Sequence, residues 1–424
     1  MKRITDALKA NSRIDDWKIN LHRRESCEMF FIKGELDCVR RTDTTNNRVT
    51  VYTDHEGFRG DSMFYVYPST TDAELEALCA DGVKKALLIK NAPYALPEAE
   101  EGAYEIDSNF SGFDSLSLAR EIGETALSAV EIDNAAINSL EVFVTKHSEE
   151  IITSRGLHKT QTRYDAMVEA IPTYNGVDSS VELYEQYNFS SYDPEALKAE
   201  IAGKIAEVKA RFEAAPPAEM PGCPVVLGAM ELWQLFREIS FDLDYSNVYS
   251  GSNLHKKGDA IQPDGSGDRL CISLVGTLPG SSRSSRFDID GVSLGSVRVV
   301  ENGIAANYHG SNRFGRYLGE KPSGILPCMK VEPGTLSPEE LGKAPYLELV
   351  SLSGLQVELY SDYIGGEVRL AYYHDGEKTV PLTGISVSGK LSEVLASIRL
   401  STVSTVTEGY CGPEKALLSG MKIF

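Results

Sequence analysis

The sequence predicts an α+β protein in which an N-terminal antiparallel sheet with helices is followed by a β-rich C-terminal domain carrying one helix. Three observations support this class. In the first third, runs of aromatic and β-branched residues alternate with turn residues. A proline-rich stretch then interrupts the chain near its midpoint. Beyond it, short strand-like runs are separated by Gly, Ser and Asp at hairpin-like intervals.

The first third contains three predicted strands, "CEMFFIK", "RVTVYTD" and "DSMFYVY", with turns at "KGEL" and "DHEGFRG". A helix is expected directly after them, because Thr71 and Glu74 have the spacing of a capping box. A second helix is expected to begin near Asp114, at "DSLSLAREIGETALSAV". Both helices are expected to pack on the sheet and so form an α+β layer.

Two further strands are predicted at "LEVFVTKHS" and "EEIITSRG", and a long helix follows them. Asp193 is placed to cap this helix, and Pro194 suits its first turn. The helix ends in "APPAEMPGCP", which combines four prolines with a glycine. Because such a segment breaks regular structure, it predicts a boundary between an N-terminal domain, residues 1–215, and a C-terminal domain, residues 222–424.

The C-terminal domain opens with a short apolar run, Cys223 to Leu227, that leads into an amphipathic helical pattern through Ser240. Apolar residues at i, i+3, i+4 and i+7 define that pattern: Leu232, Leu235, Phe236 and Ile239. Later runs such as "RLCISLVG", "SVRVVENG", "YLELVSLSG" and "SVSGKLSEVL" are predicted strands. A closed or sandwich-like β domain carrying one helix is therefore expected.

Composition narrows the range of partners. The 424 residues include 42 basic and 62 acidic side chains, and the net charge of −20 repels nucleic-acid phosphates and anionic membranes. No run approaches the roughly 20 apolar residues of a membrane span, and the N-terminus has charges where a signal peptide needs an apolar core. Seven cysteines without a CxxC pair are typical of free thiols in a reducing compartment. We expect a cytoplasmic protein with no direct nucleic-acid or membrane partner.

The residues alone do not reveal an active site. The seven histidines include no pair one helical turn apart, so a helical metal site is not predicted. Two Asp-x-Asp pairs, Asp242 with Asp244 and Asp288 with Asp290, are interpreted as turn residues, although each pair could also share a divalent cation. Glu231 and Glu238 are interpreted as part of a solvated helix face instead of a catalytic pair. Nucleophile-elbow, Walker and dinucleotide-binding motifs are missing from the sequence.

The order of several segments resembles the TldD/PmbA family, also called modulators of DNA gyrase. The resemblance covers nearly the whole chain, and its motifs are individually weak but occur in the family's order. These segments are "VFVTKHSEEIITSRGLHKTQTRY", "AAPPAEMPGCPVVLG", "NVYSGSNLHKKGDAIQ", "SSRFDIDGVSLGSVRVVENGIAANYHGSNRFGRYLGEKPSG" and "EGYCGPEKALLSGMKIF".

In the catalytic branch of that family, the strand resembling "VVL" leads into an HExxxH motif whose histidines bind zinc and whose glutamate activates water. A cysteine near the C-terminus completes the ligand set. On this sequence, Gly228 and Trp233 fall at the histidine positions and Ala229 at the glutamate position. Only Cys411 matches a family ligand, and a single thiolate does not hold zinc. The resemblance therefore implies a degenerate site with no catalytic residue, no metal ligand set and no cofactor, in which Trp233 fills the space of the ion.

In lacking the HExxxH residues, the sequence resembles the non-catalytic TldE/PmbA-like branch of the family. The resemblance implies a cytoplasmic bacterial subunit that pairs with a TldD-like catalytic subunit, the only one to hold zinc, or forms a homodimer. Such a complex degrades unfolded peptides or matures peptide substrates, and any effect on gyrase is indirect. Two alternatives stay open. The chain is a stand-alone peptide-binding or scaffold protein, or it is an enzyme with a displaced site at an Asp-x-Asp pair or at a Cys411 nucleophile.

Overall fold

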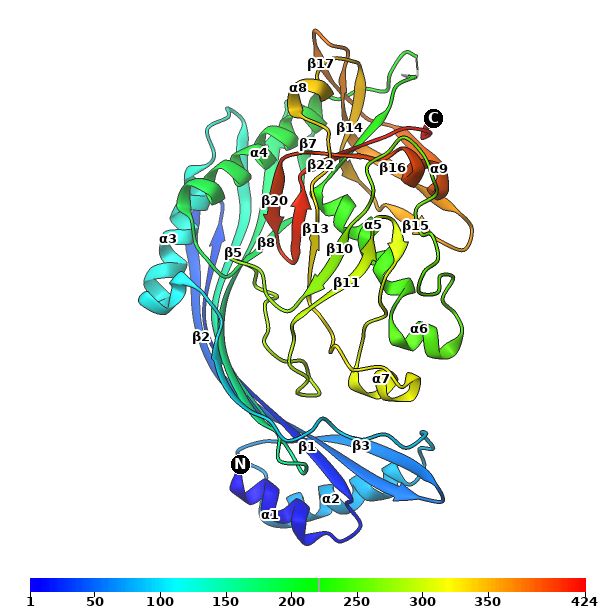
Figure 1. The fold of residues 1–424 in the computed structure, drawn as a ribbon. Coiled ribbons are helices and arrows are strands. Elements are labelled where there is room, and N and C mark those ends of the chain that lie inside the picture. Colours follow the sequence, from blue (N-terminus) through cyan, green and yellow to red (C-terminus); the bar gives the residue numbers. More distant parts are fainter. Residues whose placement is uncertain (220–221) are drawn as a thin grey trace.

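The computed structural model describes residues 1–219 and 222–424. Its N-terminal part is built on an eight-stranded sheet in the order β3-β2-β1-β5-β6-β4, with β7 and β8 also paired to β6. Figure 1 shows the long strands of this sheet curving around the C-terminal part of the chain. The strands are β1 Asp16–Ile32, β2 Glu35–His55, β3 Phe58–Val66, β4 Glu101–Glu105, β5 Ala135–Thr153, β6 His158–Asn175, β7 Ser180–Glu182 and β8 Glu185–Phe189.

The sheet is mainly antiparallel, as predicted, but its strands are longer than the apolar runs that predict them. The predicted strands at "LEVFVTKHS" and "EEIITSRG" are one strand, β5. Its polar middle stays extended because β1 pairs along one side of it and β6 along the other. The prediction of two strands is therefore wrong, since backbone pairing on both edges does not require apolar side chains.

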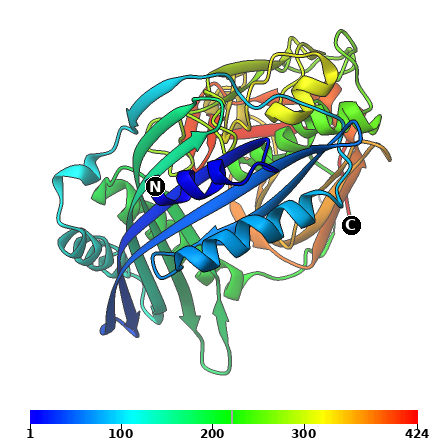
Figure 2. The same cartoon turned by 90° about the horizontal axis from the view of Figure 1, so that it is seen from below.

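Helices cover both ends of this sheet. Figure 2 shows α1 and α2, in two shades of blue, lying on the strands nearest the N-terminus. Helices α3 and α4 pack at the opposite end of the sheet, in an apolar core with residues of β1, β5 and β6. The predicted caps are confirmed: Thr71 and Glu74 form a capping box, and Asp114 and Asp193 cap α3 and α4. The helices are α1 Lys2–Ala10, α2 Asp72–Ala86, α3 Ser115–Ser128 and α4 Pro194–Glu213, with a 3₁₀ turn at Asn109–Gly112.

The described C-terminal part is rich in strands, as predicted, and contains two sheets; besides the one predicted helix it has four shorter ones. One has the order β19-β22-β9-β14-β16-β18-β23, with β15 and β17 paired to β16, and the other has the order β12-β11-β10-β13-β21-β20. The first strands and helices are β9 Val225–Gly228, α5 Ala229–Asp242, α6 Tyr245–Ser250, β10 Ile272–Val275, β11 Ser296–Glu301, β12 Ile304–Ala305, α7 Asn312–Leu318 and β13 Cys328–Val331. The remaining ones are α8 Pro338–Leu341, β14 Tyr346–Leu352, β15 Gln356–Glu358, β16 Tyr363–His374, β17 Thr379–Leu382, β18 Ile385–Lys390, α9 Leu391–Ser397, β19 Arg399–Leu400, β20 Ser404–Thr407, β21 Tyr410–Pro413, β22 Lys415–Leu418 and β23 Lys422–Ile423.

The largest apolar core joins the two C-terminal sheets to α5. Leu232, Leu235 and Phe236 are fully buried in one cluster with residues of β9, β10 and β14. The segment "SVSGKLSEVL", predicted as a strand, divides into β18 and α9, and Val394 of α9 packs in the same core. The helix between the sheets therefore has a structural role as the centre of this core.

The predicted domain division falls where the sheets change. Strands up to β8 belong to the first sheet, and those from β9 onward belong to the two others. Met220 and Pro221, in the predicted linker, lie outside the described residues. Division into residues 1–215 and 222–424 stays a prediction. Within the described part of the chain, no helix is both long and apolar enough to cross a bilayer.

Candidate functional site

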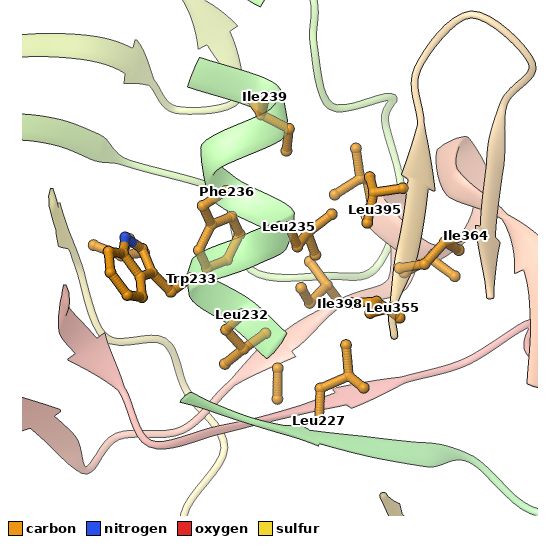
Figure 3. Close-up of a cluster of buried hydrophobic side chains, with 14 of the residues drawn as sticks. Leu227, Leu232, Trp233, Leu235, Phe236, Ile239, Leu355, Ile364, Leu395 and Ile398 are labelled. Carbon is orange, nitrogen blue, oxygen red and sulfur yellow. The ribbon is translucent and has the colours of Figure 1, made fainter. Parts of the chain in front are cut away.

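The motif positions that the resemblance assigns to a degenerate site lie at the start of α5. β9 is a buried apolar strand, and it ends at Gly228, which is the N-cap of α5 and pairs with Lys415 of β22. The apolar stripe of α5 then fixes the rotation of the helix, because Leu232, Leu235 and Phe236 are all fully buried (Figure 3). The sequence-predicted strand-to-helix unit is thus confirmed.

Trp233 points away from the aliphatic part of this core, on the other side of α5 from Leu235 (Figure 3). The residue is only 7% exposed. Its ring lies 5.0 Å from the guanidinium carbon of Arg283 and 5.4 Å from that of Arg237. A Cβ added at Gly409 would lie 3.2 Å from the Trp233 ring, so the turn between β20 and β21 closes against it. The indole is held by packing and by two cation–π contacts.

The other two motif positions offer no metal ligand. Gly228 has no side chain, and a Cβ placed there would lie 3.3 Å from Oε2 of Glu231. Ala229 is half-buried and packs against the main core. The carboxylate of Glu231 therefore lies beside the position at which the family's first imidazole would begin.

Glu231 differs from its sequence interpretation. Neither Glu231 nor Glu238 is fully exposed, so the prediction of a solvated stripe is wrong. Burial raises the pKa of Glu231, and the positive charge of Lys204 on α4 offsets only part of that effect. This charge effect on Glu231 is non-local, because α4 precedes the proline-rich segment in sequence.

Cys411 lies on β21, which pairs with β13 and β20 and contacts α5. Its half-buried side chain packs against Val275, Leu278 and Cys328. In residues 1–219 and 222–424, no hydrogen bond joins its sulfur to a histidine. The described residues also provide no group of three potential metal-ligating side chains at α5. The structure thus brings Trp233 and Cys411 to neighbouring elements, where they serve as packing groups.

Three of the four Asp-x-Asp carboxylates accept hydrogen bonds from the backbone. Asp242 accepts from the backbone nitrogens of Leu254 and His255, at 2.6 and 3.0 Å, and Asp244 caps α6. Asp288 accepts hydrogen bonds from the backbone of the turn that follows it. These contacts agree with the turn interpretation, whereas the Asp290 carboxylate forms an ion pair with Lys18 of β1 at 2.5 Å.

A groove of about 800 Å³ runs between the long sheet and loops of the C-terminal part. The sheet contributes polar side chains, including His22, Glu149 and Arg163, and the facing loop contributes residues 282–285 and 287–289. Arg283 lines this groove and also stacks on Trp233. The degenerate site therefore adjoins the groove through one shared arginine.

One cluster in the groove wall was not predicted from the sequence. His22, His147 and Glu149 place potential ligand atoms within 4.8 Å of one another. The sequence does carry a signal for part of it, because His147 and Glu149 are two residues apart in a strand and so share a face. Helical spacing of histidines does not indicate this cluster, because its residues lie on strands. The contribution of His22 depends on the register between β1 and β5.

In the C-terminal part, a helix that follows a buried strand packs with residues of two sheets in one core. Residues 221–423 match the family model described as the PmbA/TldA metallopeptidase C-terminal domain. The C-terminal part of the chain is thus a domain of the PmbA/TldD family. The sequence matches no curated protein.

Three solved structures share the fold along nearly the full length of both chains. TldE from Thermococcus kodakarensis has a TM-score of 0.80 at 16% identity, and the match covers 100% of this chain and 99% of that one. A candidate modulator of DNA gyrase from Thermotoga maritima has a TM-score of 0.78 at 16% identity and full coverage of both chains. Another from Bacteroides thetaiotaomicron has a TM-score of 0.79 at 13% identity, covering 100% of this chain and 97% of that one.

Proposed function

We propose that this chain is the non-catalytic, TldE/PmbA-like subunit of a cytoplasmic TldD-type zinc metalloprotease complex that degrades unfolded peptides or matures peptide substrates. The observation that carries this proposal is the packing of Trp233 at a motif position where a catalytic relative needs a histidine. Gly228 and Ala229 supply neither the second histidine nor the glutamate. Hydrolysis by zinc needs several protein ligands and an activated water, so the chemistry is assigned to a partner.

The groove supports a role in holding substrate. Its lining combines apolar side chains with arginine and histidine side chains from the sheet and three serines from the facing loop, Ser282, Ser284 and Ser285. Such side chains hydrogen-bond to the main chain and the carboxylate groups of an extended peptide. A non-catalytic subunit with this groove enlarges the peptide-binding surface of the complex without adding a second hydrolytic site.

Purification of the native complex tests this proposal. The tagged chain, isolated at its natural expression level, is expected to carry a partner with an HExxxH motif in a one-to-one ratio. The complex should cleave unfolded peptides, whereas the isolated chain should not. Replacing a motif histidine in the partner should abolish cleavage. If the chain is isolated only as a monomer or homodimer that binds peptides, the stand-alone binding function is correct instead.

The stand-alone alternative assigns the whole peptide-binding surface to the groove of this chain. A binding measurement with an unfolded peptide separates the two functions. If the chain is a stand-alone scaffold, the isolated chain should bind the peptide as tightly as the natively purified protein does. A subunit that contributes only part of the substrate surface binds it more weakly when isolated, because fewer contacts form.

A further inference from the structure

Two histidines and one glutamate meet on the face of the long sheet that lines the groove. β1 and β5 are antiparallel, and their register places His22 opposite Glu149. His147 lies two residues before Glu149 on β5, so both side chains project from the same face. The three residues belong to the N-terminal part of the chain, apart from the degenerate site at α5.

The separations between their ligand atoms suit a single metal ion. Nε2 of His22 lies 2.9 Å from Nδ1 of His147 and 3.7 Å from Oε1 of Glu149. Ligand atoms bound to one ion at about 2.0–2.2 Å lie roughly 3.0–3.5 Å from one another. Small side-chain rotations are therefore enough to bring all three atoms to one centre. We infer that His22, His147 and Glu149 form a binding site for a divalent transition-metal ion of the zinc type, in the wall of the groove.

The buried histidine is already oriented for this role. Nε2 of His147 lies 2.8 Å from Oδ2 of Asp165 on β6, and donates a hydrogen bond to that carboxylate. This leaves Nδ1 unprotonated, with its lone pair directed toward His22. A carboxylate behind the imidazole is the usual partner that fixes the ring and its tautomer in metal sites. Without metal, Nε2–H of His22 donates to Nδ1 of His147, and metal binding moves that proton to the other nitrogen of His22 with no net release.

Opposite charges nearly balance at the site. Glu149 and Asp165 contribute two negative charges, Arg163 lies 3.2 Å from each carboxylate, and the positive charge of Arg24 also acts on His22. Selection of an ion therefore depends on the ligand atoms. Two imidazoles and one carboxylate favour zinc and its neighbours over calcium or magnesium, which prefer oxygen ligands.

The site is open on one side. The side chain of His147 is 6% exposed, whereas those of Glu149 and His22 are 22% and 36% exposed. His22 and Glu149 both line the groove. Three protein ligands leave a tetrahedral ion with one free position, and here that position faces the groove, where water or a carboxylate from a bound peptide can occupy it.

Metal titration of the full chain tests the inference. Metal-stripped protein is titrated with Zn²⁺ alone in competition with a chromophoric chelator, and with Co²⁺ for its visible spectrum. We expect one bound ion per chain, and a Co²⁺ spectrum without a sulfur-to-metal charge-transfer band. His22→Gln and Glu149→Gln should each weaken binding at least about tenfold, and Asp165→Asn by about 10- to 100-fold through the orientation of His147.

His158→Gln is the matched control. This exposed histidine on β6 also pairs with a carboxylate, Glu150, at 2.8 Å, but it has no third ligand, so its replacement should leave affinity unchanged. Adding Zn²⁺ should raise the thermal midpoint of the wild type but not that of His22→Gln. The His22 side chain is 36% exposed, so the substitution should leave the fold intact. Absence of binding to the wild type, or binding that survives His22→Gln and is lost in Cys411→Ser, overturns the inference. Peptide cleavage, the readout of the proposed function, plays no part in this test.

Discussion

The guanidinium of Arg283 lies 5.0 Å from the centre of the Trp233 ring, and this contact links the loop that lines the groove to the helix at which catalytic relatives hold zinc. Arg283 also pairs with Glu408 at 3.0 Å. The indole therefore belongs to the support of the groove wall. At this position of α5, the side chain contributes packing.

Trp233→Ala should lower the free energy of unfolding by about 3–5 kcal/mol, because it removes a large buried ring and leaves a cavity. Chemical denaturation measures this change. Phe241→Ala is the matched control on the same helix, since Phe241 is 59% exposed and its replacement should cost less than about 1 kcal/mol. An equal, small effect of both substitutions would mean that Trp233 does not support the site.

Cys411→Ser should leave peptide cleavage by the native complex unchanged. A catalytic thiol needs a nearby base to form the thiolate, and the described residues place no histidine in hydrogen-bonding contact with this sulfur. Cleavage rates of complexes containing either form of the chain provide the measurement. Loss of cleavage, with assembly of the complex intact, would support the displaced-site enzyme.

His309 should make stability fall as the pH drops. Burial lowers its pKa, and its hydrogen bond to the Ser240 carbonyl and the charge of Asp244 offset only part of this effect. Because the folded-state pKa is below the unfolded value of about 6.5, the stabilisation is fully present above that pH and is lost as the pH falls through the folded pKa. His309→Gln should reduce the decline in unfolding free energy between about pH 7.5 and 5.5.

The exposed residue His158 again provides the control for this pH dependence. His158→Gln should retain the wild-type decline, since that side chain is 49% exposed. Urea denaturation at several pH values gives both slopes. If His309→Gln retains the full decline as well, protonation of another group governs acid stability.

Asp16→Asn should destabilise the protein by roughly 3–5 kcal/mol, because it removes the carboxylate from a buried ion-pair network. Burial raises the pKa of Asp16, but hydrogen bonds from Arg155, Ser154 and Arg59 outweigh burial and hold that pKa below its usual range. The stabilisation is therefore present above about pH 4 and is lost as the pH falls further. Asp43→Asn, which breaks the exposed pair with Arg23, should barely change the thermal midpoint.

Local sequence signals predict the helices well. The capping box of Thr71 with Glu74 and the cap at Asp193 depend on residues within one turn, so they can be identified without the fold. The strand and helix around Gly228 are equally local, because one apolar run and one periodic stripe define them. The degenerate motif positions were found by the family resemblance, which carries information that the residue pattern alone does not.

Non-local features could not be predicted in the same way. The polar middle of β5 is extended because β1 and β6 pair with it, and neither partner can be identified from its own composition. The cluster of His22 with His147 and Glu149 depends on that same register, across more than 120 residues of sequence. The charge of Lys204 likewise acts on Glu231 from α4, an element that precedes the linker.

Cleavage of an unfolded polypeptide by the purified chain alone, with Zn²⁺ supplied, distinguishes a non-catalytic subunit from an active peptidase. We expect no cleavage above the protein-free background, even when the His22 site carries metal, because α5 presents Gly228, Ala229 and Trp233 at the positions where hydrolysis needs ligands and a base. Cleavage that a chelator abolishes, and that persists in His22→Gln, would contradict it, because the C-terminal part of this chain would then hold a working metal centre.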